Sequence, residues 1–169
     1  MTLLPFSIRP ELPEDCPAID HLHAVSFGPG RFARAAFRVR EGFAHDGQLS
    51  FIASHDGVMI GSVRLTPVLI GTSAAMLLGP LAVIPEYKGR GAGRTLMMEC
   101  MNAAANQDVD YVLLVGDAPY YGPFGFKPVP VGSIRFPAPV DPARVLLADL
   151  RTLKSDLPTG AVTVRPSGS

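Results

Sequence analysis

The sequence predicts a mixed α/β fold, in which a twisted, mostly antiparallel sheet is flanked by helices and contains one β-α-β crossover. Two observations predict it. The run LSFIASHDGVMIGSVRLTPVLI holds two strands joined at Asp56 and Gly57, and both turn residues tolerate the positive φ of a hairpin. Farther on, a strand near 74–84, a helix near 91–106 and the apolar strand YVLLVG at 111–116 form a crossover with parallel strands.

The N-terminal elements precede this hairpin. FSIRP predicts a short first strand, and Asp15 is expected to cap a helix with Ile19, Leu22 and Ser26 on one side. The run GPG at 28–30 interrupts the chain before a second, arginine-rich helix. The crossover follows the hairpin, and the tail contains three strand-like runs, SIRFPA, RVLLADL and AVTVRP.

The helix near 91–106 is predicted from its apolar spacing. Its expected buried face carries Leu96, Met97, Cys100, Met101 and Ala104. Because Cys100 lies on this face and is far in sequence from Cys16, both cysteines are expected to be reduced core thiols rather than a disulfide.

Length and composition limit the class of protein. The 169 residues, 47% apolar and 18% charged, predict one globular domain over 1–169, with a core at about 8–126 and C-terminal strands at about 132–165. Fifteen basic residues balance fifteen acidic ones, so no overall field attracts nucleic acid or an acidic membrane. The N-terminal MTLLPFSIRP is too short and too interrupted by proline for a signal or a membrane span, and a cytoplasmic location is expected.

The stretch GPLAVIPEYKGRGAGRTLM predicts an anion site. Gly89, Gly91 and Gly93 alternate before the helix, which lets backbone N–H groups point outward. The helix N-terminus adds about half a positive charge, and three cations flank the glycines: Lys88, Arg90 and Arg94. A phosphate group is the expected guest. The spacing fits neither a P-loop nor a dinucleotide fingerprint, and the structural alternative is a tight turn with incidental surface cations.

These residues resemble the GNAT superfamily of acyl-CoA-dependent N-acetyltransferases. The family motif [Q/R]-x-x-G-x-[G/A] is matched by Lys88, Gly91 and Gly93, preceded by LAV at 81–83. Lys88 departs from the usual Gln or Arg, which matters little where backbone N–H groups bind. A second element, Y-x-x-[FLY]-G-F, is matched from Tyr121 to Phe126. The resemblance covers about 8–126.

The resemblance implies a site for acetyl-CoA. The pyrophosphate would lie on the glycine turn, and the pantetheine arm would pair with residues 81–83, where Gly79 and Pro80 predict a bulge. The Leu81 N–H would stabilise the oxyanion, and Tyr121 would protonate the leaving thiolate; Tyr120 is a rival in the wrong register. The implied cofactor-binding residues are Leu81, Ala82, Val83, Lys88, Gly89, Arg90, Gly91, Ala92, Gly93, Arg94 and Thr95.

The resemblance leaves the base and the acceptor open. Glu41, His45, His55 and Asp117 are candidate bases by chemistry, and none is selected by spacing. The acceptor is expected to be a small-molecule amine or an amine of a peptide or protein, and Arg34 or Arg38 of the second helix could contact an acidic one.

The sequence gives fewer indications about metals, oligomeric state and alternative functions. No metal is expected, since His21 and His23 point apart on a helix, and a monomer or homodimer is expected. The alternatives to an N-acetyltransferase are a catalytically inactive acyl-CoA sensor and an adenine-nucleotide binder.

Overall fold

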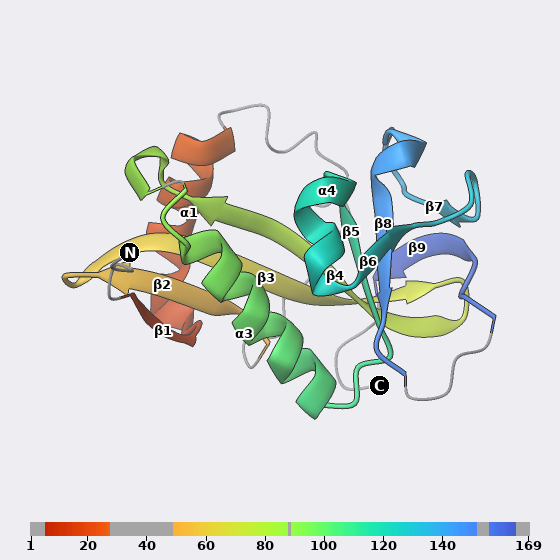
Figure 1. Cartoon of the computed structure of the whole chain (residues 1–169), viewed down its shortest axis with the longest axis horizontal. Helices are drawn as coiled ribbons and strands as arrows, with labels where there is room; N and C mark the ends of the chain where they lie inside the picture. Colours follow the sequence, from red (N-terminus) through yellow and green to blue (C-terminus); the bar gives the residue numbers. More distant parts are fainter. Residues whose placement is uncertain (1–5, 28–48, 88, 152–155, 165–169) are drawn as a thin grey trace.

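The computed structural model describes residues 6–27, 49–87, 89–151 and 156–164. The predicted second helix and its arginines, as well as Glu41, His45 and Lys88, lie outside these ranges. Within them, strands form one mixed sheet with helices against it (Figure 1). The strands are β1 (Ser7–Pro10), β2 (Phe51–His55), β3 (Val58–Ile70), β4 (Ser73–Val83), β5 (Tyr111–Val115), β6 (Phe126–Pro128), β7 (Ile134–Arg135), β8 (Val145–Asp149) and β9 (Gly160–Val164).

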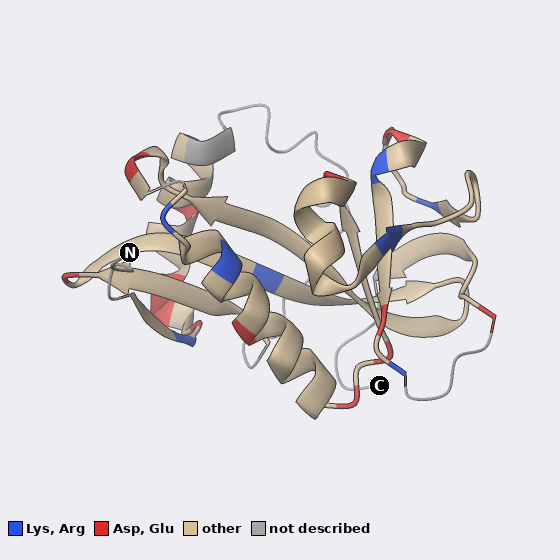
Figure 2. Ribbon diagram, in the orientation of Figure 1, with Lys and Arg blue, Asp and Glu red and all other residues tan. Residues whose placement is uncertain are grey.

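The helices comprise three α-helices and several short 3₁₀ helices in the described ranges. The α-helices are α1 (Cys16–Phe27), α3 (Ala92–Asn106) and α4 (Ala118–Tyr121), and the 3₁₀ helices are η1 (Pro13–Asp15), η3 (Pro85–Tyr87), η4 (Gly122–Phe124) and η5 (Pro142–Arg144). Acidic and basic positions are interspersed along the ribbon (Figure 2). No helix among the described residues is long and apolar enough to cross a bilayer.

The sheet confirms the predicted fold class. Its main strand order is β1-β2-β3-β4-β5-β8-β6, with β9 pairing β3 and β7. The β2–β3 hairpin turns at Asp56 and Gly57, both with positive φ, as predicted. Pairing is antiparallel except between β4 and β5 and between β7 and β9. The β4–α3–β5 unit is therefore the predicted crossover.

Helix α3 packs one face of the sheet. Its buried residues are Ala92, Leu96, Met97, Cys100, Met101 and Ala104, which includes the whole predicted face. They pack in one core cluster with residues such as Val63 and Leu65 of β3. Because side chains alternate along a strand, Ser62, Arg64 and Thr66 belong to the opposite face, where α1 packs against β3 and β4.

Strand β4 bulges where Gly79 and Pro80 predicted it. Leu78 pairs with Leu65 and Leu81 pairs with Val63, so Gly79 and Pro80 lie opposite Arg64 alone. Gly79 has φ 142°, a value suited to glycine. Pairing with β5 is recorded only at Met76 and Leu77. The two parallel strands therefore diverge past the bulge, and among the described strands only β3 pairs with residues 81–83.

The C-terminal segment completes the sheet by non-local pairing. Strand β8 inserts between β5 and β6, and β7 and β9 pack in a second core cluster with the ends of β3 and β4. The predicted strand SIRFPA is shorter than expected, since only Ile134–Arg135 is extended. Proline at position 137 cannot donate to a ladder, which favours an early end.

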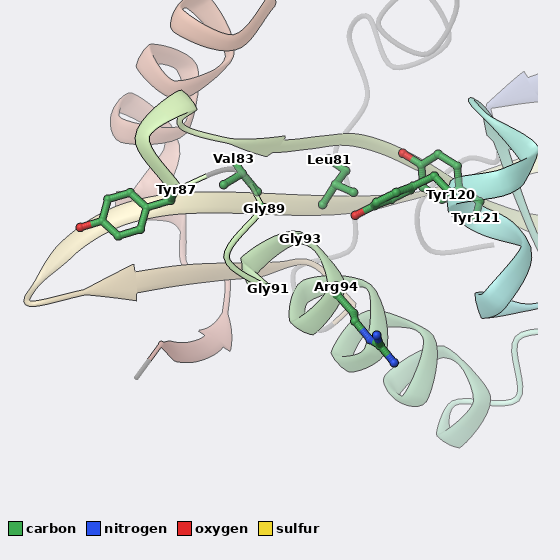
Figure 3. A pocket seen from close by; sticks show the side chains of 9 residues that line it. All are labelled: Leu81, Val83, Tyr87, Gly89, Gly91, Gly93, Arg94, Tyr120 and Tyr121. Atoms are coloured by element: carbon green, nitrogen blue, oxygen red, sulfur yellow. The ribbon is translucent and has the colours of Figure 1, made fainter. Parts of the chain in front are cut away.

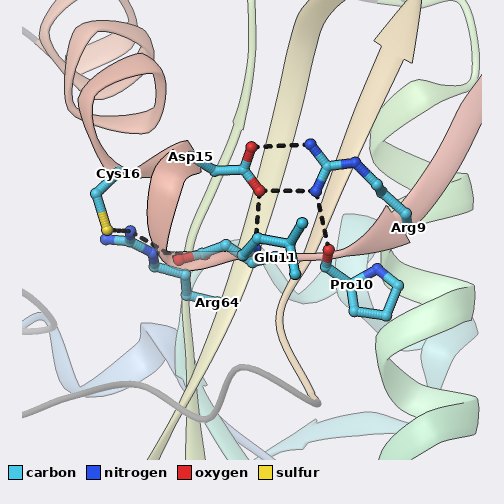
Figure 4. A network of polar contacts seen from close by, with 7 residues as sticks. Arg9, Pro10, Glu11, Asp15, Cys16 and Arg64 are labelled. Atoms are coloured by element: carbon cyan, nitrogen blue, oxygen red, sulfur yellow. Dashed lines mark hydrogen bonds and ion pairs between the residues drawn. The ribbon is translucent and has the colours of Figure 1, made fainter.

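The environment of Asp15 differs from the prediction. Asp15 directly precedes α1, but its carboxylate accepts hydrogen bonds from the Leu12 N–H at 2.8 Å and from both terminal nitrogens of Arg9 at 2.7 and 2.8 Å. It therefore fixes the β1–α1 connection rather than capping α1 (Figure 4). Both cysteines are free, as predicted, although Cys16 is only partly buried, and its sulfur lies 3.8 Å from an Arg64 nitrogen.

Candidate active site

The glycine turn joins the end of β4 to the start of α3. Gly89 and Gly91 have φ values of 78° and 93°, a left-handed conformation that disfavours any side chain. Gly91 is the N-cap of α3. Its carbonyl accepts hydrogen bonds from the Thr95 backbone N–H at 3.0 Å and from the Thr95 hydroxyl at 2.8 Å. The first backbone N–H groups of α3 have no hydrogen-bond partner within the helix. They lie next to the glycine turn, because Gly91 is the N-cap.

A cavity of about 470 Å³ lies over this turn. It is lined by Leu81, Val83, Tyr87, Gly89, Gly91, Gly93, Arg94, Tyr120 and Tyr121 (Figure 3). In the close-up, Tyr87 and the two adjacent tyrosines approach from opposite ends. The structure thus brings together the bulged strand, the three glycines and the second motif's tyrosine, which are separated in sequence.

Four of the predicted cofactor residues are described but do not line the cavity: Ala82, Arg90, Ala92 and Thr95. Ala82 and Ala92 are buried, and Ala82 faces away from Leu81 and Val83 because side chains alternate along a strand. Arg90 is exposed, and its guanidinium lies 5.6 Å from the centre of the Tyr87 ring. Lys88 is outside the described residues.

Tyr121 is held at the cavity by packing. Its ring contacts Tyr120 and Phe126 in edge-to-face arrangements, with centroid distances of 4.8 and 6.0 Å. A Cβ added at Gly116, the residue after β5, would collide with Cε2 of Tyr121. Gly116 therefore leaves the space that the Tyr121 ring uses, a contact that the sequence pattern does not reveal.

Tyr120 also reaches the cavity, contrary to the expectation from its register. Its hydroxyl oxygen lies 2.9 Å from the position that a Cβ on Gly93 would occupy, so it extends to the first turn of α3. Burial raises the pKa of the Tyr120 hydroxyl above its ordinary value, which keeps the hydroxyl protonated at neutral pH. Tyr87 is the other lining residue that the sequence reasoning missed, although it stands directly before the glycine motif.

The described candidate bases lie outside the cavity lining. The His55 ring is 5.6 Å from the ring of Tyr87, a lining residue that lies at the other end of the cavity from Tyr121 (Figure 3). Asp117 directly precedes α4, and its carboxylate lies 3.5 Å from Arg144. Among the described residues, no three histidine, cysteine or acidic side chains gather as a metal site.

One cavity is lined by a bulged strand that leaves its parallel neighbour, a glycine turn at a helix N-terminus and a tyrosine, which is the arrangement expected of an acyl-CoA-dependent acyltransferase. The chain belongs to the acetyltransferase (GNAT) family, whose sequence model matches residues 16–126. It is similar to the uncharacterized N-acetyltransferase YhbS of Escherichia coli, with 35% identity over 124 residues that cover 71% of this chain and 72% of the relative.

Two solved structures support the same assignment. The structure of YhbS from Escherichia coli in complex with CoA has a TM-score of 0.80 and 27% identity, covering 98% of this chain and 92% of that one. A GNAT family acetyltransferase from Brucella melitensis in complex with acetyl-CoA has a TM-score of 0.71 and 26% identity, covering 95% and 96%. The predicted family, fold and enzyme class are therefore confirmed.

Proposed function

We propose that this protein transfers an acetyl group directly from acetyl-CoA to a primary amine. The observation that carries the proposal is the single cavity that joins the glycine turn, the open side of the bulged β4 and Tyr121. The CoA and acetyl-CoA complexes of the two structural relatives support the choice of cosubstrate.

The glycine turn fits a pyrophosphate. Nothing lies within 4 Å of the Cβ positions at Gly89 and Gly91, so the backbone is open to a ligand there. The start of α3 supplies N–H groups and a partial positive charge, and the exposed Arg90 and Arg94 add cationic side chains. The pantetheine arm would extend along residues 81–83, whose second edge is left open by the divergence of β4 from β5.

The thioester of acetyl-CoA would lie between the β4 bulge and α4. The amine attacks the thioester carbonyl, and the Leu81 N–H stabilises the oxyanion that develops. When the C–S bond breaks, Tyr121 donates a proton to the departing thiolate. An alkylamine of pKa about 10.4 is almost wholly protonated at pH 7, so the ammonium must first lose a proton, for which we assign no side chain.

A titration with a strain-matched control tests the cofactor site. Gly91 and Gly57 have φ values of 93° and 78°, and no described atom lies within 4 Å of the Cβ position at either residue. Glutamate at either position adds similar backbone strain and the same charge, but only Gly91→Glu places that charge on the turn. We expect calorimetry to show acetyl-CoA binding to wild type and to Gly57→Glu, at least tenfold weaker binding to Gly91→Glu, and little binding of ATP or NAD.

Turnover is tested separately by release of the CoA thiol in the presence of amines. Thiol release that depends on amine would support catalysis. Acetyl-CoA binding without thiol release across a broad amine panel would instead favour an acyl-CoA sensor. Equal binding of acetyl-CoA to wild type and Gly91→Glu would contradict the proposed position of the pyrophosphate.

A further inference from the structure

We call the cavity over the glycine turn the cofactor cavity. A second cavity shares the lining residue Tyr120 with it. Its volume is also about 470 Å³, and it lies among the end of β5, the start of α4 and η5. Two other cavities, one lined by Leu49 and Gln107 and one by Ile134 and Phe136, share no lining residue with the cofactor cavity. The second cavity therefore adjoins the cofactor cavity at the Tyr120 side chain.

Direct transfer requires that the acceptor amine bind in a space next to the cofactor cavity. The attacking nitrogen must come within about 3 to 3.5 Å of the thioester carbon, so an acceptor has to bind in a space adjoining the cofactor cavity. The backbone holds the second cavity in a fixed relation to the tyrosines, because the Tyr120 and Tyr121 N–H groups both donate to the Asp117 carbonyl at 3.1 Å. Asp117 and Tyr120 are therefore held in a fixed relative position by the backbone of α4.

The charges of this cavity indicate the chemistry of its ligand. Its lining contains one acidic and one basic residue, Asp117 and Arg144, while Gly116, Ala118, Pro119 and Ala143 provide small, uncharged walls. The two charged groups lie 3.5 Å apart, with 73% of the Asp117 side chain and 47% of the Arg144 side chain exposed. Exposed ion pairs contribute little stability, so a ligand carrying both charges can replace the pair at small cost.

We propose that this cavity is the acceptor subsite and that it takes a small zwitterionic amine, with the ammonium at Asp117 and a carboxylate at Arg144. The inference rests on the proposed acetyl transfer and specifies its acceptor class. Asp117 holds the ammonium beside Tyr120, and the ammonium loses one proton to water, which leaves a neutral amine that attacks the thioester carbon. The new C–N bond replaces the C–S bond, and the nitrogen releases a second proton to water. The thiolate takes the proton donated by Tyr121, and water returns a proton to the Tyr121 phenolate.

Amino acids paired with their decarboxylated amines test the carboxylate contact. Suitable pairs are phenylalanine with phenethylamine and alanine with ethylamine, with kcat/KM measured by thiol release. We expect wild type to prefer the amino acid by about tenfold or more, as a charged hydrogen bond supports. Arg144→Gln should lower this preference to about threefold or less, mainly by raising the acceptor KM. Arg135→Gln, which changes an exposed arginine in another cavity, should keep it.

Calorimetry with acetyl-CoA separates the two levels of the proposal. Wild type and Arg144→Gln should bind acetyl-CoA equally. An equal preference for the decarboxylated amines, or an unchanged preference in Arg144→Gln, would overturn the acceptor subsite. Acetyl-CoA binding without acetylation of any member of the pairs would also overturn this acceptor class while leaving the cofactor site intact. Failure to bind acetyl-CoA would overturn the proposed function itself and the subsite with it.

Discussion

The Tyr121 ring occupies space that exists because Gly116 has no side chain. A Cβ on Gly116 would contact Cε2 of Tyr121 and lie 3.0 Å from its Cδ2. Gly116 directly follows β5 and Tyr121 ends α4, so this contact limits how closely the helix approaches the end of the strand. The position of the proposed proton donor thus depends on a glycine that carries no chemistry of its own.

Replacing Gly116 by alanine should displace Tyr121. We expect kcat to fall about tenfold or more, since proton transfer depends on position, while the KM for acetyl-CoA changes little. The added methyl group should lower the free energy of unfolding by about 1–3 kcal/mol. Gly122→Ala is the matched control, because Gly122 has helical φ and ψ of −52° and −43° and no described atom within 4 Å of its Cβ position. Equal kcat in the two variants would contradict the positioning role.

Phenylalanine substitutions at Tyr120 and Tyr121 should lower kcat to different extents, because we assign proton donation to Tyr121 alone. Tyr121→Phe removes the proposed general acid, and we expect kcat to fall about 10²-fold, at the lower end of general acid–base effects. Tyr120→Phe should reduce kcat by less than about fivefold, since we assign its hydroxyl no proton transfer. The reverse order of losses would transfer the acid role to Tyr120, and steady-state kinetics of the two variants at neutral pH measure both.

Local patterns in the sequence predicted the elements around the cofactor site. The α3 face follows from the spacing of Leu96, Met97, Cys100 and Met101, and the hairpin follows from Asp56 and Gly57, because each depends on residues a few positions apart. The bulge was predictable because Gly79 and Pro80 break a strand ladder.

Contacts between distant segments were not predictable in this way. Nothing local in RVLLADL shows that β8 inserts between β5 and β6. The contact of Gly116 with Tyr121 depends on the angle between a strand and a helix. The family motif matches Tyr121 alone, so it does not predict that Tyr120 also lines the cavity. Both rings reach the cavity because they belong to the same helical turn. Asp15 was expected to cap α1 because its preference for that position is strong, yet the Arg9 guanidinium and the Leu12 N–H bind its carboxylate.

The Arg9–Asp15 pair should make stability depend on pH. Hydrogen bonds from Arg9, and to a smaller extent from the Leu12 N–H, lower the pKa of Asp15 below its ordinary value. Because the pKa is lower in the folded state, this stabilisation is present above the unfolded pKa of about 4 and is lost as pH falls through the folded pKa. Arg9→Gln should therefore reduce stability at pH 7 and have little effect at pH 2. Since the Arg9 side chain is 45% exposed, the loss should be about 1 kcal/mol or less.

Urea unfolding at the two pH values measures this difference. Arg135→Gln is a suitable control, since Arg135 is an exposed arginine on β7 and lies far along the sheet from β1. An equal loss in Arg9→Gln at pH 7 and pH 2 would show that Arg9 stabilises the fold by packing rather than through the carboxylate.

The Glu11–Arg64 pair should be strongly coupled, because it is buried at the centre of the fold. Arg64 donates to the two Glu11 oxygens at 2.9 and 3.1 Å, and only 1% of the Glu11 side chain and 11% of the Arg64 side chain are exposed. Arg64 lies on β3 opposite the β4 bulge, so the pair links the β1–α1 connection to β3 at the position of the bulge (Figure 4). Arg64→Met would remove the guanidinium that donates two hydrogen bonds to a buried carboxylate, and we expect a loss of about 3–5 kcal/mol.

A double-mutant cycle measures this coupling. Glu11→Leu combined with Arg64→Met should recover most of the stability lost in either single variant, because an apolar pair of similar volume can replace a buried ion pair. Arg144→Met tests an exposed ion pair with the same substitution, and it should cost about 1 kcal/mol or less. If the Glu11→Leu and Arg64→Met losses simply add in the double variant, the two side chains stabilise the fold through separate contacts. A recovery would show that the ion pair contributes mainly by neutralising a charge that the fold has already buried beside the bulge.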